Sequence, residues 1–495
     1  MNTYPALLIV APLLAALFTG IFVWIEERLC YPIAVLGMLI SSFSAYKILM
    51  AVLSAGVIHY RHAGWAPPMG IEYRIDTLNA MVLLLITLIA LINLVASYKT
   101  ILVETPDRSG SFITIYLLFV VGLLGVTATG DLFNLYVLLE ITSLTSYAQI
   151  GLGDKDRGPL ASLNYVFIGV IGASFYLLGV GYLYIKTGSL NMMDVATIIS
   201  TMHDSNTVLV AFILCMIGVW IKMALFPLHV WLPNAYSYAP TAVARVVAPL
   251  MTKVMVYVMV RLMITVFGFD YIFSTLDLSA AVVWLATIAI LAGGLMALAQ
   301  KDLKKMLAYI IVSEIGYMVG GAWLGNTTGM TGTILHILND AVMTFALFLA
   351  VGNMIYVCGH VGFDNLKGLF GRMPWTMGGF VLAAFSIIGV PPTCGFFSKW
   401  YLVLGAFEAG AYHFAAALII SSLICAILFF RIFEIGFFPE PSDGDDHAHA
   451  HHEPAVMVEA PVSMLVPLGL VSLSLIIVGL YSGTIVNTII LPMLQ

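Results

Sequence analysis

The sequence contains little charge and few cysteines. Only 9% of its 495 residues are Asp, Glu, Lys or Arg, and the formal net charge is −6. The five cysteines are scattered without a CxxC pair, which indicates neither a disulfide framework nor a cysteine metal site. No glycine-rich loop of the kind that cradles phosphate stands out, which argues against an ATP-driven pump. We expect no cofactor and no metal on this chain.

Apolar residues dominate instead. They make up 61% of the chain, and the mean hydropathy is +1.03. A soluble core does not need so much, so the composition predicts an all-α integral membrane protein in contact with a lipid bilayer and not with nucleic acid. No basic residue precedes the first apolar run, which therefore indicates a first span and not a cleaved signal peptide.

Fourteen apolar segments are long enough to span a bilayer, at about 20 residues each. They lie near residues 5–24, 31–54, 78–98, 112–129, 132–150, 160–185, 207–227, 241–267, 279–300, 304–324, 330–357, 376–402, 409–438 and 461–488. Because most connectors are short, we expect a single membrane domain over residues 1–495.

Basic residues in the connectors predict the orientation. Three of them, Arg61, Arg74 and Lys186, follow even-numbered spans. Ten follow odd-numbered spans: Arg28, Lys99, Arg108, Lys155, Arg157, Lys301, Lys304, Lys305, Lys367 and Arg372. By the positive-inside rule, the first face is cytoplasmic, and both termini lie outside the cell membrane.

The stretch MIGVWIKMALFPLHVWLPNAYSYAP breaks two rules of an apolar span. Lys222 lies inside the hydrophobic run, and Pro227 follows five residues later. A proline has no N–H to bond the carbonyl of Met223, so the helix is expected to break there. A lysine within a span is usually functional or paired. The alternative is a kinked core helix whose lysine extends to the membrane surface.

Similar features recur twice. Pro391 and Pro392 interrupt SIIGVPPTCGFFSKWYL, in which Lys399 follows. In VVAPLMTKVMVY, Pro249 and Lys253 predict a third break. Interrupted helices in both halves of a long hydrophobic chain are typical of inverted-repeat transporters.

Acidic residues are rare within the spans. Glu140 lies near the middle of the fifth, where a lone carboxylate takes up a proton or binds a cation. Lys222 is the candidate partner. A buried pair of this kind either acts as a switch, in which the lysine releases its proton when the pair loosens, or is a static ion pair. Asp131 lies at the entrance of the same span.

Segments ten and eleven add further protonatable residues. His336 and Asp340 lie one turn apart and therefore on one helical face. His336 is either a proton relay or a neutral histidine bonded to the backbone. Glu314 either pairs with Lys304 or Lys305 or titrates. These residues complete a row of protonatable groups across the chain.

Two features leave alternatives open. His229, at the outlet of the first break, is a secondary candidate that could serve only to cap freed carbonyls. The run DGDDHAHAHHEP (443–454) lies in a connector expected to be cytoplasmic. It either binds a divalent metal or is a solvated loop without fixed structure.

Several motifs resemble those of the antiporter-like membrane subunits shared by Mrp-type cation/proton antiporters, complex I and membrane-bound hydrogenases. The most specific are TGDLFNLYVLLE, IKMALFPLHVWLPNAYSYAP, PLMTKV, KDLKKMLAY and GVPPTCGFFSKW. The resemblance covers nearly the whole chain and is greatest to the D-type component of Mrp complexes or its hydrogenase relatives. Because nothing follows Gln495, we expect no long lateral helix after span fourteen.

The resemblance implies a division of the chain. Two inverted five-helix repeats would comprise helices 4–8 (112–267) and helices 9–13 (279–438), with helices 7 and 12 broken. Helices 1–3 (1–111) would precede them, and a His/Asp-rich loop (439–460) and helix 14 (461–495) would follow.

The resemblance also implies roles for individual residues. Glu140 and Lys222 would form the regulatory pair. Lys253 and His336 would relay protons along the central axis, and Lys399 would be the terminal proton-exchanging lysine.

The chain departs from the family pattern at four positions. Thr344 stands where relatives often carry a lysine, Asn234 and Tyr236 stand where an acid and a histidine are common, and Arg245 adds a charge where small residues are usual. The axis is therefore either incomplete or completed by water and Asp340.

We therefore expect a proton-translocating subunit of a multisubunit membrane complex. An Mrp-type antiporter would exchange H⁺ for Na⁺ or K⁺, with small membrane subunits and a second antiporter-like subunit as partners. A redox-driven complex of membrane-bound hydrogenase, formate hydrogenlyase or NADH:quinone oxidoreductase type would include peripheral redox subunits instead. A non-conducting structural subunit is the third hypothesis, and Thr344 is its main support.

Overall fold

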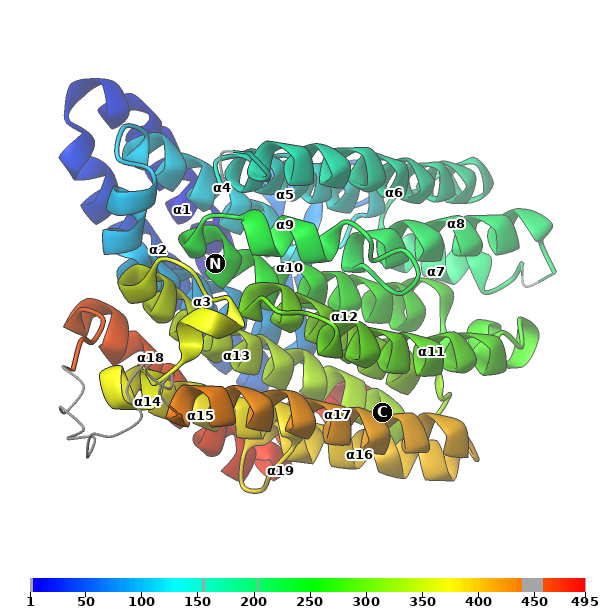
Figure 1. Cartoon of the computed structure of the whole chain (residues 1–495). Helices are drawn as coiled ribbons and strands as arrows, with labels where there is room; N and C mark the ends of the chain where they lie inside the picture. The colour runs from blue at the N-terminus through cyan, green and yellow to red at the C-terminus, as the bar shows by residue number, and fades with distance from the viewer. Residues whose placement is uncertain (1–2, 154–155, 203, 439–456, 495) are drawn as a thin grey trace, which may run out of the picture.

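The computed structural model describes residues 3–153, 156–202, 204–438 and 457–494, which form a helical bundle (Figure 1). The helices are α1 (Tyr4–Ile25), α2 (Cys30–Ala55), α3 (Thr77–Glu104), α4 (Ser109–Ala128), α5 (Leu132–Gly151), α6 (Gly158–Thr187), α7 (Met192–Ile199), α8 (Asn206–Met223), α9 (Leu232–Tyr238), α10 (Thr241–Arg261), α11 (Ser279–Leu298), α12 (Leu303–Trp323), α13 (Thr327–Cys358), α14 (Leu369–Arg372), α15 (Pro374–Ile388), α16 (Cys394–Glu408), α17 (Tyr412–Phe437), α18 (Val462–Leu480), α19 (Ser482–Ile485) and α20 (Leu491–Leu494). A small hairpin, β1 (Ile58–Arg61) with β2 (Glu72–Ile75), joins α2 to α3.

The prediction of an all-α integral membrane protein is confirmed. Among the described residues, 12 helices are long and apolar enough to cross a membrane. The other two predicted spans coincide with α5, a helix of 20 residues, and with the pair α15 and α16. The count of fourteen spans and the inverted repeats stay predictions. The run 443–454 lies outside the described residues.

Two of the three predicted breaks are present. α8 ends at Met223, the residue whose carbonyl Pro227 cannot bond, and α9 begins only at Leu232. α15 ends at Ile388, before Pro391 and Pro392, and α16 begins at Cys394. At the first break, the carbonyl of Ile221 accepts from the N–H of Ala224 (3.2 Å) and from the indole N–H of Trp231 (3.1 Å).

The third predicted break is wrong. α10 runs without interruption from Thr241 to Arg261, with Pro249 inside it. Every residue of α10 is buried, so neighbouring helices pack on all its sides. A single proline removes one backbone hydrogen bond and bends a helix, and a helix held by its neighbours tolerates that loss.

The most buried helices form the middle of the bundle. In Figure 1, α10, α12 and α13 lie between α6 and α8 on one side and α15–α17 on the other. The most apolar stretch of Thr241–Phe267, the segment that contains α10, is 89% buried, and that of α12 is 94% buried. Polar side chains on these helices therefore face other protein groups and not lipid. Functional charges in membrane proteins are found in such interior positions.

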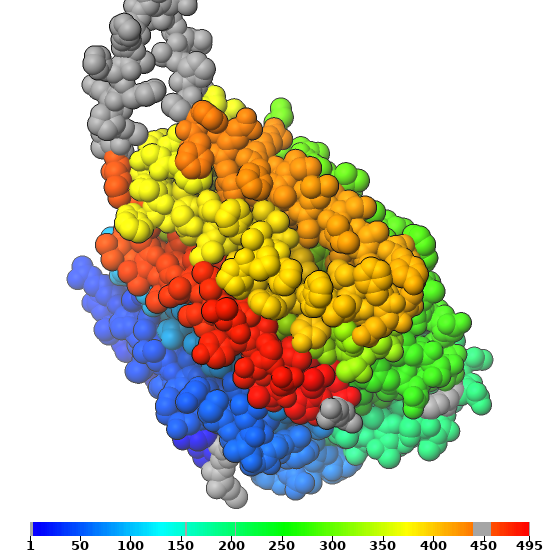
Figure 2. Space-filling model, turned by 90° about the horizontal axis from the view of Figure 1, so that it is seen from below, coloured from blue at the N-terminus to red at the C-terminus, as the bar shows by residue number. Residues whose placement is uncertain are grey.

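The C-terminal segment packs against the N-terminal helices. Figure 2 shows it as a red band between the blue N-terminal region and the yellow to orange helices of the second half. The hydroxyl of Thr77, at the start of α3, donates to the carbonyl of Ile489 (3.0 Å). The C-terminal segment and α3 therefore belong to one bundle.

Candidate functional site

Lys222 and Glu140 lie side by side, as predicted. The Lys222 ammonium is 3.2 Å from Glu140 Oε1 and donates to Ser143 Oγ at 2.7 Å. Lys222 lies in the last turn of α8, where the helix dipole and the freed carbonyls favour a cation. The break therefore places the ammonium at a negative helix end, opposite a carboxylate on α5.

The two members of this pair differ in exposure. The Lys222 side chain is 1% exposed, whereas that of Glu140 is 22% exposed. On α5, Glu140 shares an outward face with Phe133, Val137 and Leu144, all of which are exposed. Glu140 is therefore the member of the pair that a neighbouring molecule in the membrane could contact.

A second ion pair joins α10 to α13. Lys253 Nζ lies 2.9 Å from Asp340 Oδ2, and both side chains are buried. The Thr344 hydroxyl donates to Asp340 Oδ1 (2.8 Å) and accepts from Lys253 (3.4 Å). At the position where relatives often carry a lysine, Thr344 thus connects two charged groups, and Asp340 supplies the protonatable group.

His336 lies between α12 and α16. Its Nε2 is 3.1 Å from Glu314 Oε2, and its Nδ1 is 2.9 Å from Ser398 Oγ. All three residues are buried. The second oxygen of Glu314 has no hydrogen-bond partner among the described residues. A histidine bonded on both ring nitrogens can accept a proton on one side and release one on the other.

Glu314 does not pair with Lys304 or Lys305. Lys304 lies ten residues and Lys305 nine residues earlier on α12, which corresponds to about 15 Å along the helix. Lys304 instead donates to the carbonyl of Ala239 (2.9 Å). Of the two alternatives for Glu314, pairing with a lysine at the helix end is therefore wrong, and the carboxylate belongs to the buried row.

Lys399 follows Ser398 directly. Its ammonium donates to the carbonyls of Ile387 (2.5 Å) and Ile388 (3.5 Å) and to Ser422 Oγ (3.2 Å), and it lies 5.0 Å from the centre of the Tyr317 ring. Within the described parts of the chain, no carboxylate forms an ion pair with it. Lys399 belongs to α16, and its ammonium thus lies at the carboxyl end of α15, the first half of the broken helix.

The secondary candidates have other surroundings. Asp131 caps the N-terminus of α5 by accepting from the Asn134 N–H (2.7 Å), and burial raises the pKa of its carboxyl above the ordinary range. The His229 ring stacks on Phe226. Arg245 lies buried between α3, α10 and α13.

A metal could be considered at the centre of the second half. Ligand atoms of Glu314, His336 and Asp340 lie within 4.8 Å of one another. Both ring nitrogens of His336 are already bonded, however, and Asp340 is paired with the ammonium of Lys253. A nearby ammonium opposes binding of a cation, so this geometry favours proton exchange over metal binding.

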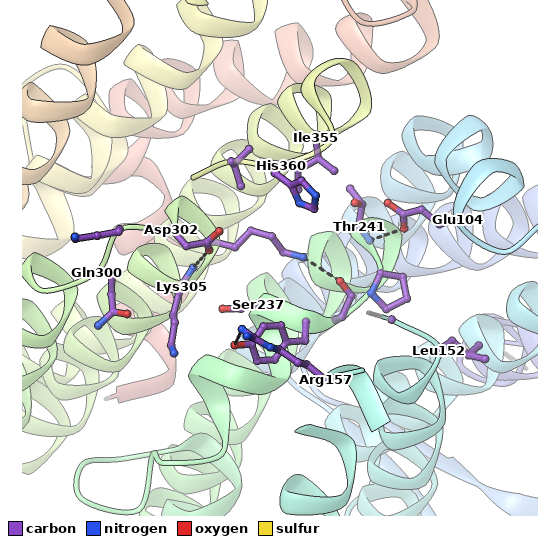
Figure 3. Close-up of a pocket in the computed structure, with 18 residues that line it drawn as sticks. Glu104, Leu152, Arg157, Ser237, Thr241, Gln300, Asp302, Lys305, Ile355 and His360 are labelled. Carbon is purple, nitrogen blue, oxygen red and sulfur yellow. Dashed lines mark hydrogen bonds between the residues drawn. The ribbon is translucent and has the colours of Figure 1, made fainter. Parts of the chain in front are cut away.

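One face of the bundle contains a cavity of about 650 Å³ (Figure 3). It lies where α3, α5, α9 and α13 end and where α10 and α12 begin. Arg157, Lys301, Lys304, Lys305 and His360 line it, so we call this side the basic face. The prediction that the connectors carrying these residues are cytoplasmic stays a prediction.

Comparison with known proteins identifies the family of the chain. Residues 129–425 match the family described as NADH:quinone oxidoreductase/Mrp antiporter, transmembrane. The chain belongs to this family. The matched region covers more than half of the chain, and every candidate residue from Asp131 to Lys399 lies inside it.

Two members of the family show how widely its functions differ. The N-type subunit of NADH-quinone oxidoreductase from Desulforudis audaxviator is 41% identical, over 98% of this chain and 97% of that protein. The D-type subunit of the Na⁺/H⁺ antiporter from Alkalihalophilus pseudofirmus is 30% identical, over 89% of each chain.

Two solved structures have the same fold. A chain of the membrane-bound sulfane sulfur reductase, an archaeal respiratory membrane complex, aligns with a TM-score of 0.88 and 29% identity, over 99% of this chain and 96% of that one. A chain of the Mrp complex from Dietzia sp. DQ12-45-1b aligns with a TM-score of 0.86 and 25% identity, over the same shares of the two chains.

Sequence reasoning missed several polar partners in this member of the family. Ser143 lies one turn after Glu140, and Ser398 immediately precedes Lys399, so their positions were a usable signal. Tyr317 and Ser422 contact Lys399 from other helices. No local pattern marks that kind of contact, because it depends on how the helices pack.

Proposed function

We propose that this chain is the proton-translocating, antiporter-like subunit of a multisubunit membrane complex. The Glu140–Lys222 pair controls proton uptake, and Lys253, Asp340, His336 and Glu314 pass protons toward Lys399. The observation that carries the proposal is the buried row of Lys253, Asp340, His336 and Glu314, in which Lys253 pairs with Asp340, His336 bonds to Glu314, and ligand atoms of Asp340, His336 and Glu314 lie within 4.8 Å of one another.

Two kinds of complex fit this role. In an Mrp-type antiporter, proton movement through this chain is exchanged for Na⁺ or K⁺ handled with companion subunits. In a redox-driven complex, electron transfer in other subunits drives protons through this chain. The NADH-quinone oxidoreductase relative, at 41% identity, favours the redox complex over the antiporter, whose relative is 30% identical.

The third hypothesis, a non-conducting structural subunit, is less well supported. Its main argument was Thr344 in place of a lysine. Asp340 lies beside Thr344 and pairs with Lys253, so a protonatable group is present at that step. Retention of Glu140, Lys222 and Lys399 also argues for conduction.

The proposed setting is the cell membrane with both termini outside. The excess of basic residues in the connectors after odd-numbered spans supports this orientation. The exposed face of α5 that carries Glu140 is the proposed contact with another membrane subunit, because binding there could loosen the pair with Lys222.

Transport by the assembled complex in liposomes tests the proposal. Lys222→Ala should abolish transport, whereas Glu140→Ala should impair it without preventing assembly. Wild-type rates in assembled Lys222→Ala complexes would refute the mechanism. Copurification in mild detergent, followed by a cofactor spectrum, distinguishes the two kinds of complex. Iron–sulfur signals indicate a redox-driven pump, and small hydrophobic partners alone indicate an antiporter.

A further inference from the structure

Arg245 is a buried charge that the proposed proton route does not use. It lies on α10, one turn after Thr241, which lines the cavity of the basic face. Lys253, the first member of the buried row, follows eight residues later on the same helix, about 12 Å deeper. Arg245 therefore lies between the cavity and the row.

The guanidinium is held from two other helices. It donates to the Phe348 and Leu349 carbonyls and to Asn353 Oδ1 on α13, with distances of 3.4, 3.2 and 2.9 Å. On α3, it donates to the carbonyl of Ala96 (3.4 Å) and to Ser97 Oγ (3.3 Å). These bonds fix its position where α3, α10 and α13 meet.

The backbone of α13 leaves room for this side chain. A Cβ atom on Gly352 would lie 2.3 Å from the guanidinium nitrogens. The arginine thus fills the space beside α13 on the line from the cavity to Thr344 and Asp340. The guanidinium therefore lies beside α13 between Ile355, which lines the cavity, and Thr344.

In the described part of the chain, Glu104 is the acid whose charge acts on Arg245, but it does not reach the guanidinium to form an ion pair. All five of its hydrogen bonds go to neutral oxygens, and within the described residues no carboxylate forms an ion pair with it. Glu104, which lines the cavity (Figure 3), accepts instead from the N–H of Thr241 (2.8 Å). By contrast, Arg261 on the same helix is paired with Asp76.

We propose that Arg245 is a fixed positive barrier that excludes protons and metal cations from the direct route between the basic-face cavity and Lys253. Guanidinium stays protonated in proteins, so the barrier is permanent. Positive side chains in a narrow path exclude cations in other membrane pores by the same electrostatic effect. The proposal rests on the proposed function, because it assigns protons to entry by way of the Glu140–Lys222 pair.

Passive proton leak through the assembled complex tests this barrier. The complex is reconstituted in liposomes, a potential is set with K⁺ and valinomycin, and proton influx is followed with an internal dye, without the driving reaction or Na⁺. Arg245→Gln should raise the leak by about tenfold or more, because the polar layer remains but the charge is gone. Arg245→Lys, which keeps a cation, should leak less than Arg245→Gln.

A pH-dependent variant separates charge from packing. Arg245→His should leak at about pH 8, where imidazole is neutral, and should leak less once the pH is low enough to protonate the imidazole, which burial shifts below its ordinary range. This decrease is opposite to the effect of a higher proton concentration. If Arg245→Gln does not assemble, Arg245→His prepared at acidic pH and then shifted to alkaline pH provides the same test.

Asn353→Leu is the matched control, because it removes the shortest hydrogen bond of Arg245 and keeps the charge. It should leak no more than wild type. An equal leak in Asn353→Leu and Arg245→Gln would overturn the barrier, as would a wild-type leak in assembled Arg245→Gln. Lys222→Ala, measured for coupled transport in the same liposomes, tests the proposed function separately. Loss of transport there, with no leak in Arg245→Gln, refutes only the barrier.

Discussion

The ammonium of Lys253 lies 2.9 Å from the carboxylate of Asp340, inside the most buried part of the bundle. The pair joins two helices that carry no other ion pair with each other in the described structure, and Thr344 bonds to both charged groups. Charges buried this deeply are destabilising unless they are paired and hydrogen-bonded. The pair meets that condition, and variants of its two members test the proposed proton relay.

Asp340→Asn should abolish proton transport and weaken the folded state. The amide cannot take up a proton, and Lys253 loses its counter-charge in a buried site, which costs about 3–5 kcal/mol. Transport in liposomes and thermal unfolding in detergent measure the two effects. In the double variant Lys253→Met/Asp340→Leu, stability should return while transport stays absent.

Thr344→Ser serves as the control for that pair, since it retains the hydroxyl that bonds to Asp340 and Lys253. It should transport at close to the wild-type rate. Full activity in assembled Asp340→Asn complexes would show that Asp340 is not a step in the relay.

Glu314→Gln should lower proton transport by about 10²-fold, the size of effect typical of a lost acid–base group. The amide preserves the hydrogen bond to His336 but cannot exchange the proton. Ser313→Ala is the control on the same helix, because Ser313 bonds to Ile290 and Ser421, outside the row. A loss in Ser313→Ala as large as that in Glu314→Gln would attribute the effect to packing of α12.

Local chemistry explains why the two breaks and the first ion pair could be predicted from the sequence. Pro227 and the pair Pro391–Pro392 remove backbone donors regardless of what surrounds them. Lys222 and Glu140 are among very few charged residues within the spans, so few residues of opposite charge could pair with either of them.

The errors arise where the outcome depends on neighbouring helices. Pro249 looks like the other prolines in the sequence, yet α10 continues through it because the helix is packed on every side. The partner of Glu314 depends on the rotation of α12 relative to α13, which no single-helix pattern reveals. Here that rotation turns Glu314 toward His336. The spacing of nine and ten residues along α12 by itself excludes Lys305 and Lys304, and it could be read from the sequence.

Gly218→Val should disrupt the complex through helix packing. A Cβ atom at Gly218 would lie 2.6 Å from the carbonyl oxygen of Gly172 and 2.7 Å from the Tyr176 nitrogen, so backbone atoms of α6 would have to move. Lys222 lies one turn after Gly218 on α8, and its contact with Glu140 should be lost as α8 shifts.

The yield of assembled complex on size-exclusion chromatography and its transport rate measure that disruption. Gly181→Ala on α6 is the matched control, because no atom lies within 4 Å of the added methyl group. It should match wild type or gain up to about 1 kcal/mol in stability. Normal assembly of Gly218→Val would show that α6 and α8 can separate without cost.

Asp76→Asn should destabilise the protein at neutral pH but not in acid. Asp76 caps α3, and its two oxygens accept from Arg261 on α10 at 2.6 and 2.8 Å. Burial by itself would raise the pKa of this carboxyl, but the charge and hydrogen bonds of Arg261, with the charge of Arg74, outweigh burial and hold the pKa below its ordinary value. The carboxylate is therefore more acidic in the folded protein than in the unfolded chain.

A carboxyl group of this kind stabilises the fold above its unfolded pKa of about 4, and the contribution is lost as the pH falls through the lower folded value. At about pH 7, Asp76→Asn should cost about 3–5 kcal/mol, because Arg261 is left without a counter-charge. Thermal unfolding at about pH 7 and at a pH below about 4 measures the difference in stability between Asp76→Asn and wild type. This difference should shrink steadily below about pH 4. Arg74→Gln removes a longer contact of 3.4 Å from a partly exposed side chain and should cost about 1 kcal/mol or less. A difference between Asp76→Asn and wild type that is equal at both pH values would mean that capping of α3, and not the charge on Asp76, is what stabilises this corner of the bundle.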